Sequence, residues 1–288
     1  MKVLITGANG QLGQALARTA PRDARLLLRS HGDLDISDAE AVRQLLETEQ
    51  VELIVNAAAY TAVDQAESDR TRAVAVNTDG PRHLAQSANA FGARLIHVST
   101  DFVFDGKSSK SYETAAPLAP LNVYGETKAE GERAIAASLA AHAIVRTSWV
   151  YAPWGANFVL TMLRLMRERG SVRVVADQIG RPTSALSLAR AVWNFAGRPD
   201  LVGTFHWADA GVASWYDLAV AIAEEAEVLG MVPGGTKVLP IASEEYPTPA
   251  RRPRFSVLDT RSTSHATGMQ PAHWRVELRE VLRSVAHA

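Results

Sequence analysis

The first half of the chain alternates short apolar runs with longer amphipathic stretches, and this alternation constrains the fold more than any other feature. Such alternation is typical of βαβ units, which build a parallel sheet. We expect an α/β fold with a Rossmann-type doubly wound parallel sheet. Its expected strands and helices are 2–6, 11–19, 25–28, 38–49, 52–56, 70–91, 94–99, a helix that begins near Asn122, and a last apolar segment over 143–151.

The second half has a different pattern, which suggests a second, smaller unit. Proline and glycine interrupt its last third, which we expect to be irregular. We therefore expect a dinucleotide-binding domain over 1–151 and a smaller, mainly substrate-binding α/β domain over 152–288. Some elements between about 171 and 229 are expected to return to the main sheet. The expected elements of this half are helices over 157–169, 185–195 and 215–229 and a strand over 172–176.

Composition excludes several classes of function. The chain has 288 residues, 30 basic and 31 acidic side chains, and no cysteine. A balanced charge does not attract nucleic acid or an anionic membrane, so we expect neither as a partner. The absence of cysteine rules out thiolate chemistry and disulfides, and the apolar run at 3–5 is too short for a signal peptide or a membrane span. We expect a cytoplasmic protein whose chemistry uses oxygen and nitrogen groups.

A glycine-rich turn lies between the first expected strand and the first expected helix. Gly7, Gly10 and Gly13 have the Gly-x-x-Gly-x-x-Gly spacing. The first glycine would permit a tight turn, the second would let the backbone approach a pyrophosphate, and the third would allow close packing of helix on strand. The free N–H groups at the helix N-terminus would then face the phosphates. This segment predicts a nicotinamide dinucleotide site.

The end of the second strand distinguishes the two nicotinamide cofactors. Arg29 and Ser30 follow the strand directly, and both suit a 2′-phosphate. Asp33 lies close to the place where an NAD-type carboxylate would contact the ribose, so the signal is mixed. We expect NADPH, with NADH as the alternative.

A tyrosine and a lysine mark the expected catalytic end. Tyr124 and Lys128 lie one helical turn apart in a helix for which Asn122 is a good N-cap. A nearby ammonium favours the phenolate, so we expect Lys128 to lower the pKa of Tyr124 by roughly 3 units and make it a general acid and base near neutrality. Thr100, at the end of its strand, would hydrogen-bond a substrate carbonyl. The alternative is that Tyr124 and Lys128 are only one face of an amphipathic helix.

With these motifs the chain resembles the extended short-chain dehydrogenase/reductase superfamily, and within it the dTDP-4-dehydrorhamnose reductase family. The Tyr–Lys pair is common to the superfamily, whereas the segments at 57–64 and 146–151 are more specific to this reductase group. The resemblance implies reduction of the C4 ketone of dTDP-4-dehydro-L-rhamnose to dTDP-L-rhamnose, a donor for cell-surface polysaccharides. The matching segments are 6–13, 55–67, 99–106, 120–128, 146–151, 177–183 and 252–259.

The resemblance also implies roles for individual residues. Tyr124 would protonate the alkoxide, Lys128 would hold the nicotinamide ribose and tune the tyrosine, and Thr100 would adjust the proton transfer. Trp149 has an alternative as core filler. The remaining implied contacts are Gly10, Gln11 and Leu12 with the pyrophosphate, Asp35 and Ile36 with the adenine, Ala59, Tyr60 and Thr61 with the nicotinamide side, and Thr100, Asp101 and Trp149 with the deoxysugar.

Two further features concern anions and metals. Arg252, within the cluster Arg251, Arg252 and Arg254, could bind the substrate diphosphate through bidentate contacts, or the cluster could be a solvated basic loop. Some family members are described as dimers bridged by magnesium through carboxylates on the first helix and on the helix after Gly-x-Pro-Thr. Neither 14–17 nor 184–188 contains a carboxylate here. We therefore expect no bound metal, and a monomer or weak homodimer.

Two other functions compete with this interpretation. Another nucleotide-sugar reductase or an epimerase would share the glycine turn and the catalytic pair. A cofactor-binding regulatory subunit is a different class, since the regulatory subunit of methionine adenosyltransferase resembles this reductase family. Thr100, Tyr124 and Lys128 are all present here, and a purely structural protein has no chemical need for the three together.

Overall fold

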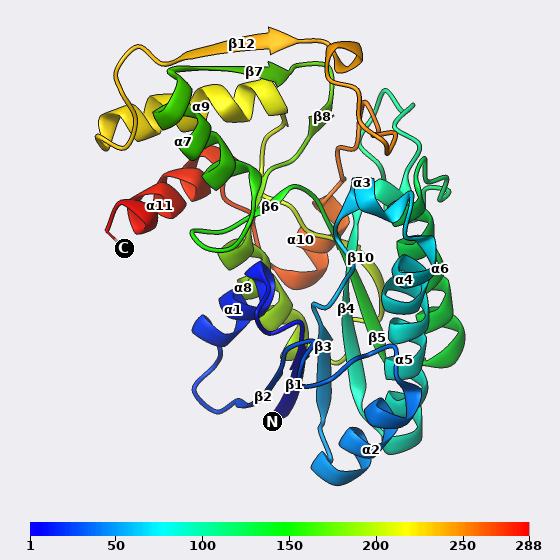
Figure 1. Cartoon of the computed structure of the whole chain (residues 1–288). Coiled ribbons are helices and arrows are strands. Elements are labelled where there is room, and N and C mark those ends of the chain that lie inside the picture. Colours follow the sequence, from blue (N-terminus) through cyan, green and yellow to red (C-terminus); the bar gives the residue numbers. More distant parts are fainter. Residues whose placement is uncertain (288) are drawn as a thin grey trace.

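The computed structural model describes residues 1–287 and contains a six-stranded parallel sheet (Figure 1). The chain runs outward from β1 to β2 and then returns to the other side of β1 with β3. This reversal creates a switch point between β1 and β3, where ligands of doubly wound sheets bind. The expected fold class is confirmed. In spatial order the strands are β10 (Gly203–His206), β5 (His142–Thr147), β4 (Arg94–Thr100), β3 (Leu53–Asn56), β1 (Lys2–Thr6) and β2 (Arg25–Arg29).

Successive side chains of each strand point to opposite faces of the sheet, and helices cover both faces. On one face Val3 and Ile5 pack in a cluster with α1 (Gln11–Arg18) and α8 (Ala185–Ala196). On the other face Leu4 packs in a second cluster with three helices. These are α2 (Ala39–Glu49), α5 (Gly80–Phe91) and α6 (Val123–Ser138).

Two expected elements of the first half are interrupted. The long helix expected over 70–91 consists of α4 (Arg70–Val74), a π-helical turn η1 (Ala75–Asp79) and α5. The strand expected over 143–151 ends with β5, and Trp149 then adopts φ +49°, which is uncommon for a residue other than glycine. The chain resumes as β6 (Val150–Tyr151), which pairs with β9 (Thr183–Ser184). Both interruptions lie next to the site described below.

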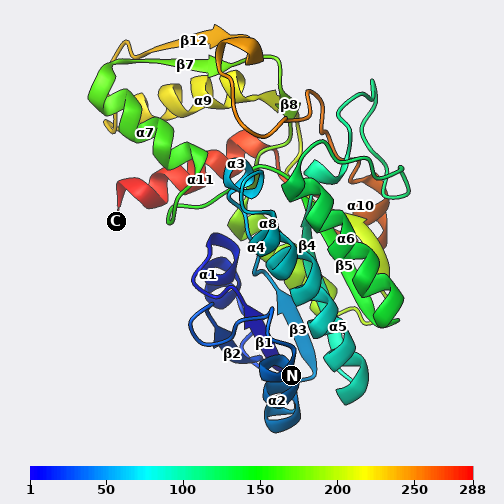
Figure 2. The same cartoon turned by 45° about the vertical axis from the view of Figure 1, so that its right-hand side comes forward.

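A second lobe lies beyond the carboxyl ends of the strands (Figures 1 and 2). Its core contains Leu163, Ile222 and Leu278. Beyond residue 229 the chain also forms β12, α10 and α11, which the sequence analysis did not identify. The remaining elements of the second half of the chain are α7 (Phe158–Arg169), β7 (Ser171–Val175), β8 (Ile179–Gly180), β11 (Ala213–Ser214), α9 (Trp215–Val228), β12 (Lys237–Ile241), η3 (Ser243–Glu245), α10 (Arg261–Thr267) and α11 (Trp274–Ala286). Two short elements of the first half are α3 (Val63–Ala66) and η2 (Asp101–Val103).

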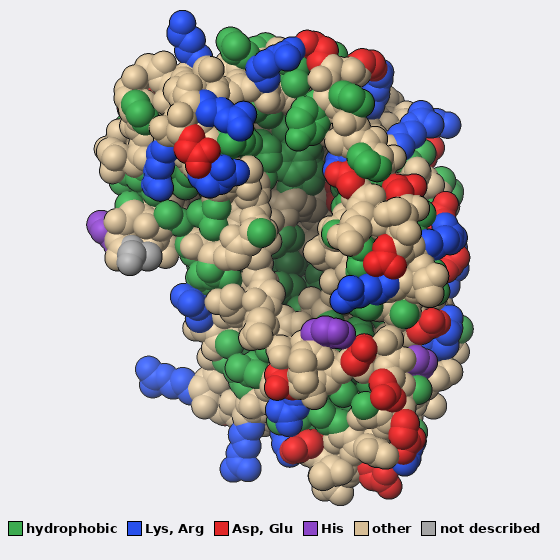
Figure 3. All heavy atoms as spheres, viewed as in Figure 1, with side chains coloured by type: hydrophobic (Ala, Val, Ile, Leu, Met, Phe, Trp, Pro, Cys, Tyr) green, Lys and Arg blue, Asp and Glu red, His purple; other side chains and the backbone are tan. Residues whose placement is uncertain are grey.

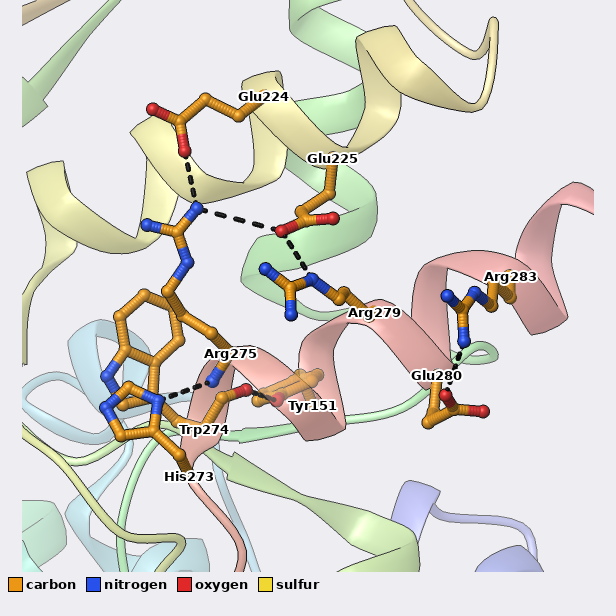
Figure 4. Close-up of polar contacts among 9 residues, drawn as sticks. All are labelled: Tyr151, Glu224, Glu225, His273, Trp274, Arg275, Arg279, Glu280 and Arg283. Atoms are coloured by element: carbon orange, nitrogen blue, oxygen red, sulfur yellow. Dashed lines mark hydrogen bonds and ion pairs between the residues drawn. The ribbon is translucent and has the colours of Figure 1, made fainter.

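Ion pairs join α11 to α9 on the surface of this lobe (Figure 4). Arg275 contacts Glu224 at 2.5 Å, and Arg279 contacts Glu225 at 2.7 Å. Exposed pairs of this kind contribute about 0.2–1 kcal/mol each. The buried apolar face of α11, including Leu278, therefore contributes most of the attachment. Within the described residues no helix is both long enough and apolar enough to cross a bilayer.

Candidate active site

A cavity of about 910 Å³ opens between the carboxyl ends of the strands and the second lobe. Figure 3 shows this face of the molecule hollowed between the two sides. The switch point between β1 and β3 lies at its floor, as expected for a doubly wound sheet. The residues proposed from the sequence that line this cavity are Gly7, Gly10, Gln11, Leu12, Ser30, Asp35, Ile36, Ala59, Tyr60, Thr61, Thr100, Asp101, Tyr124, Lys128, Trp149 and Arg252.

The glycine turn forms one wall of the cavity. Gly7 has φ +68°, and a Cβ added there would lie 2.7 Å from the Ala58 nitrogen, so only glycine fits between the two loops. The Gly10 amide donates to the Gly7 carbonyl at 2.9 Å and precedes α1. Gly13 does not line the cavity, and a Cβ on it would lie 2.3 Å from the Gly7 oxygen. Gly13 therefore allows close packing, while Gly7 and Gly10 open the backbone to the cavity.

The end of β2 differs from the expectation in one respect. Ser30 lines the cavity, but Arg29 does not. The Arg29 guanidinium lies 3.9 Å from Glu49. Asp33 accepts hydrogen bonds from the Ser30 amide at 2.9 Å and the Ser30 hydroxyl at 2.6 Å, so this carboxylate orders the turn. His31 and Arg72, to which the sequence analysis gave no role, also line the cavity. The pKa of Asp35 is lowered chiefly by the hydrogen bond from Ser37, and the charges of His31 and Arg72 act in the same direction.

The loop after β3 carries Ala59, Tyr60 and Thr61. Asn77, in the π-helical turn, accepts from the Tyr60 amide at 2.9 Å and donates to the Tyr60 carbonyl at 3.1 Å. The Asn77 side chain thus pairs with both backbone polar groups of Tyr60, as a neighbouring strand would, and so fixes the loop. The π turn therefore has a local function, because it places a buried side chain against the loop that lines the cavity.

Tyr124 and Lys128 lie on α6 and line the same cavity, as their spacing predicted. Asn122 caps the helix, accepting from the Gly125 amide at 2.8 Å. The expected lowering of the Tyr124 pKa was wrong. Burial raises the pKa of Tyr124 to about 12, with the Asp101 charge acting in the same direction and a hydrogen bond to Thr100 opposing it. Lys128 donates to the Val98 carbonyl at 2.7 Å and lies 3.1 Å from His97, and burial lowers its pKa to about 8.

Thr100 and Asp101 lie at the end of β4, beside Tyr124. The Thr100 hydroxyl donates to Asp101 at 3.1 Å and also accepts from the Phe102 amide. The Asp101 side chain is 1% exposed, and its Oδ2 has no protein partner among the described residues. Burial raises the pKa of Asp101 to about 7. A carboxyl group that titrates near neutrality is therefore part of the cavity wall.

Two indole rings form the wall on the side of the second lobe. Trp149 stacks on Trp215 with ring centroids 3.6 Å apart and an interplanar angle of 5°. Both rings line the cavity, so Trp149 is more than a filler of the core. Trp215 is the first residue of α9 and was not identified from the sequence. A flat aromatic wall of this kind suits the apolar face of a sugar or a base.

Of the three arginines in the cluster, Arg252 lines the cavity, whereas Arg251 and Arg254 do not. Arg252 lines the cavity and forms a forked contact with Asp64, at 3.0 Å through Nη1 and 2.7 Å through Nη2. Arg254 is exposed and pairs with Glu244, and Arg251 does not line the cavity. Because Asp64 is in α3 and Arg252 lies between η3 and α10, their pair links the first half of the chain to the second.

The described part of the chain contains no cluster of three histidine, aspartate or glutamate side chains suited to a metal ion. Neither α1 nor α8 carries a carboxylate.

Comparison with known proteins identifies the family. Residues 1–287 match the family model described as RmlD substrate binding domain. The dTDP-4-dehydrorhamnose reductase of Aggregatibacter actinomycetemcomitans is 39% identical, over 97% of this chain and 98% of the relative. The chain belongs to the dTDP-4-dehydrorhamnose reductase family. The resemblance inferred from the motifs is confirmed, and with it the oxidoreductase class.

Solved structures of the same family superpose along the whole chain. The reductase of Clostridium acetobutylicum has a TM-score of 0.94 and 37% identity, covering 99% of both chains. The reductase of Bacillus anthracis, in complex with NADP, has a TM-score of 0.92 and 35% identity, covering 98% of this chain and 99% of its own. A UDP-glucose 4-epimerase from Thermus thermophilus, 20% identical with a TM-score of 0.82, shares the fold.

Proposed function

We propose that this reductase converts the C4 ketone of dTDP-4-dehydro-L-rhamnose to an alcohol, giving dTDP-L-rhamnose, with NADPH as the hydride donor and NADH as the alternative. Family membership and the NADP complex of the Bacillus anthracis neighbour support the substrate and the cofactor. The observation that carries the proposal is the convergence of Thr100, Tyr124 and Lys128 with the glycine turn in one cavity.

The cofactor would lie across the switch point. Gly7 and Gly10 leave room for a pyrophosphate beside the N-terminus of α1, where free N–H groups attract anions. Gln11 and Leu12 would contact the same group, and Asp35 and Ile36 would line the adenine site. When bound, the nicotinamide supplies the hydride. Lys128 and the loop of Ala59, Tyr60 and Thr61 would hold its ribose and ring.

A 2′-phosphate would lie beside Ser30. His31 and Arg72 line this part of the cavity and provide nearby basic groups, whereas Arg29 is directed to Glu49. The basis for NADPH therefore moves from Arg29 to Ser30, His31 and Arg72.

Tyr124 would donate the proton to the substrate oxygen. With a pKa near 12 the phenol keeps its proton at physiological pH, as an acid for ketone reduction must. Thr100, which lines the same cavity as Tyr124, would orient this transfer. Because the pKa is raised, little of the phenolate, the base that the reverse oxidation requires, would be present at neutral pH.

The sugar nucleotide would occupy the side of the cavity nearest the second lobe. Asp101 and Trp149 would contact the deoxysugar, and Arg252 would contact the diphosphate. In this arrangement residues 1–151 mainly hold the cofactor, and residues 152–288 mainly hold the nucleotide sugar, with β10 and α8 returning to the first unit. We further propose a cytoplasmic monomer or weak homodimer that requires no metal.

The deciding experiment measures NADPH and NADH oxidation by the purified protein with dTDP-4-dehydro-L-rhamnose, alongside Tyr124→Phe, with the product identified by NMR. We expect dTDP-L-rhamnose, and a loss of kcat in the variant of about 10²–10⁴-fold with cofactor binding retained. Isomerisation without net cofactor oxidation would indicate an epimerase. Cofactor binding without turnover, together with a co-purifying catalytic partner, would indicate a regulatory subunit.

A further inference from the structure

An ion pair joins Asp64 of α3 to Arg252 in the cavity wall. Asp64 Oδ1 accepts from Arg252 Nη1 at 3.0 Å, and Asp64 Oδ2 accepts from Nη2 at 2.7 Å. The hydrogen bonds from Arg252 lower the pKa of Asp64, so the carboxylate is charged at neutral pH. Arg252 lines the cavity, whereas Asp64 does not. The carboxylate therefore holds the guanidinium from outside the cavity.

The N–H groups of the Arg252 guanidinium can be assigned one by one. A guanidinium presents an end fork, made by one hydrogen each of Nη1 and Nη2, and a side fork, made by Nε–H and the other Nη2–H. Asp64 occupies the end fork. The second Nη1 hydrogen faces the Thr248 hydroxyl and the Ala250 carbonyl. Within the described residues Nε has no acceptor and is not sealed from solvent. The side fork is therefore free.

The segment that carries Arg252, residues 248–252, is itself held on two sides. The Ala250 amide donates to Asp64 Oδ1 at 3.2 Å, so one carboxylate fixes both the backbone of this segment and its arginine side chain. Asn122, which caps α6, donates through Nδ2 to the Arg251 carbonyl at 2.7 Å. The position of the guanidinium is thus set relative to α3 and to the N-terminus of α6.

Few other cations line the cavity. Among the described residues, the lysine and arginine side chains in its wall are Arg72, Lys128 and Arg252. Arg72 acts on the charge of Asp35, at the proposed adenine site, and Lys128 donates to a backbone carbonyl of β4. Arg252 is the remaining cation, and its planar fork matches two oxygens of a phosphate group better than an ammonium does.

We propose that Asp64 is a positioning residue, which holds the end fork of Arg252 so that the side fork is free to bind the diphosphate of the nucleotide sugar through two hydrogen bonds. This inference rests on the proposed function, and it adds a residue from outside the cavity to the substrate site. Without the carboxylate the guanidinium would keep its charge, but its long side chain would occupy several rotamers. Holding it in one orientation lowers the entropic cost of binding.

The charge of Asp64 has a second effect, which acts in the opposite direction. It offsets the charge of Arg252, so the pair attracts an anion less strongly than a lone arginine would. The two side chains are 24% and 40% exposed, so solvent and salt screen this effect. A bidentate contact, in contrast, requires the correct direction at short range. We therefore expect positioning to outweigh neutralisation, and removal of the Asp64 charge to weaken diphosphate binding.

The first test measures binding of dTDP to the protein saturated with NADP⁺, which fills the other pyrophosphate site. Calorimetric titration should show about tenfold weaker binding in Asp64→Asn, the loss expected for one hydrogen bond to a charged group. Glu244→Gln, which removes the charge of an exposed partner of Arg254, is the matched control and should leave dTDP binding unchanged.

The outcomes of this test are distinct. Unchanged or tighter dTDP binding in Asp64→Asn, beside a wild type that binds dTDP, would overturn the positioning role and leave the proposed function intact. A wild type that does not bind dTDP would contradict the proposed nucleotide-sugar function, and this inference with it.

The second test separates orientation from charge and from general stability. Arg252→Lys keeps the charge but has no fork, so it should bind dTDP as weakly as Arg252→Ala. In the Arg252→Ala background Asp64→Asn should cause no further loss, because the carboxylate acts through the arginine. In turnover, Asp64→Asn should raise the KM for the nucleotide sugar about tenfold and leave kcat nearly unchanged. Wild-type affinity in Arg252→Lys, or additive losses in the double variant, would contradict the proposal.

Discussion

Arg146 of β5 and Glu132 of α6 form a buried, forked ion pair, and Glu132 lies one helical turn after Lys128. Arg146 Nε and Nη2 contact the Glu132 carboxylate at 2.9 and 2.7 Å, and the two side chains are 5% and 4% exposed. Ser99 donates to the same carboxylate at 2.5 Å, and Arg146 also donates to the Thr114 carbonyl at 3.0 Å. The pair therefore joins β5, the end of β4 and α6, three of the elements that place Thr100, Tyr124 and Lys128.

Removing one member of this pair should be costly. Arg146→Met leaves the Glu132 charge buried without its partner, so we expect a loss of about 3–5 kcal/mol in the free energy of unfolding. Urea denaturation followed by circular dichroism measures the loss. The control is Arg43→Met, which breaks two exposed pairs with Glu40 and Glu47 and should cost less than about 1 kcal/mol. Equal losses in the two variants would mean that the buried pair does not stabilise the site.

Arg252→Ala should weaken substrate binding. The side chain lines the cavity and is held by Asp64, so its loss removes a cation from the proposed diphosphate site. We expect the KM for the nucleotide sugar to rise about tenfold, or about 1.4 kcal/mol, with the KM for NADPH unchanged. Arg254→Ala, which removes an exposed arginine paired with Glu244, should leave both constants unchanged. If the two variants behave alike, Arg252 does not contact the substrate.

Gly10→Val should weaken cofactor binding without unfolding the protein. A Cβ at Gly10 would lie 3.2 Å from the Gly7 oxygen, a tight but tolerable contact, and the branched side chain would enter the space proposed for the pyrophosphate. Fluorescence titration with NADPH should show the loss, and the Tm should stay near that of the wild type. Gly197→Val, with its nearest atom at 3.7 Å, controls for the substitution itself. Unchanged NADPH affinity would refute the role of the glycine turn.

Asp101 should make stability depend on pH. Its pKa is near 3.8 when exposed and about 7 in the folded protein, so the folded state binds more protons between these values and is destabilised as pH rises through that window. Asn does not titrate. The stability of Asp101→Asn relative to wild type should therefore increase by roughly 2 kcal/mol from pH 5 to pH 8. Urea midpoints at both pH values test this, and a pH-independent difference would show that Asp101 has an ordinary pKa.

Local signals in the sequence were sufficient for most of the fold and for the centre of the site. Each strand of the first half places alternate side chains on two buried faces, and this produced recognisable apolar runs. The Asn122 cap and the four-residue spacing put Tyr124 and Lys128 on one face because helix geometry is local. Gly7 could be recognised because the tight turn requires its positive φ.

Contacts between distant segments could not be predicted in the same way. Trp215 reaches the cavity by stacking on Trp149, which is far from it in the sequence, and no pattern near Trp215 indicates this. The Tyr124 pKa was misjudged because burial of the phenol raises it, and this burial depends on the packing of distant segments around α6. The expected place of Arg29 beside the cofactor also depended on a distant segment, because its guanidinium lies near Glu49 of α2.

The late return of β10 to the sheet bears on how the protein is made. β10 is the sixth strand and pairs with β5, and α8 shares a core with α1. When only the first 151 residues have left the exit tunnel, the β5 edge of the sheet is unpaired and the α1 face lacks one of its two covering helices. Unpaired edges and bare apolar faces promote aggregation. We therefore expect this nascent chain to need protection until residue His206 has left the exit tunnel.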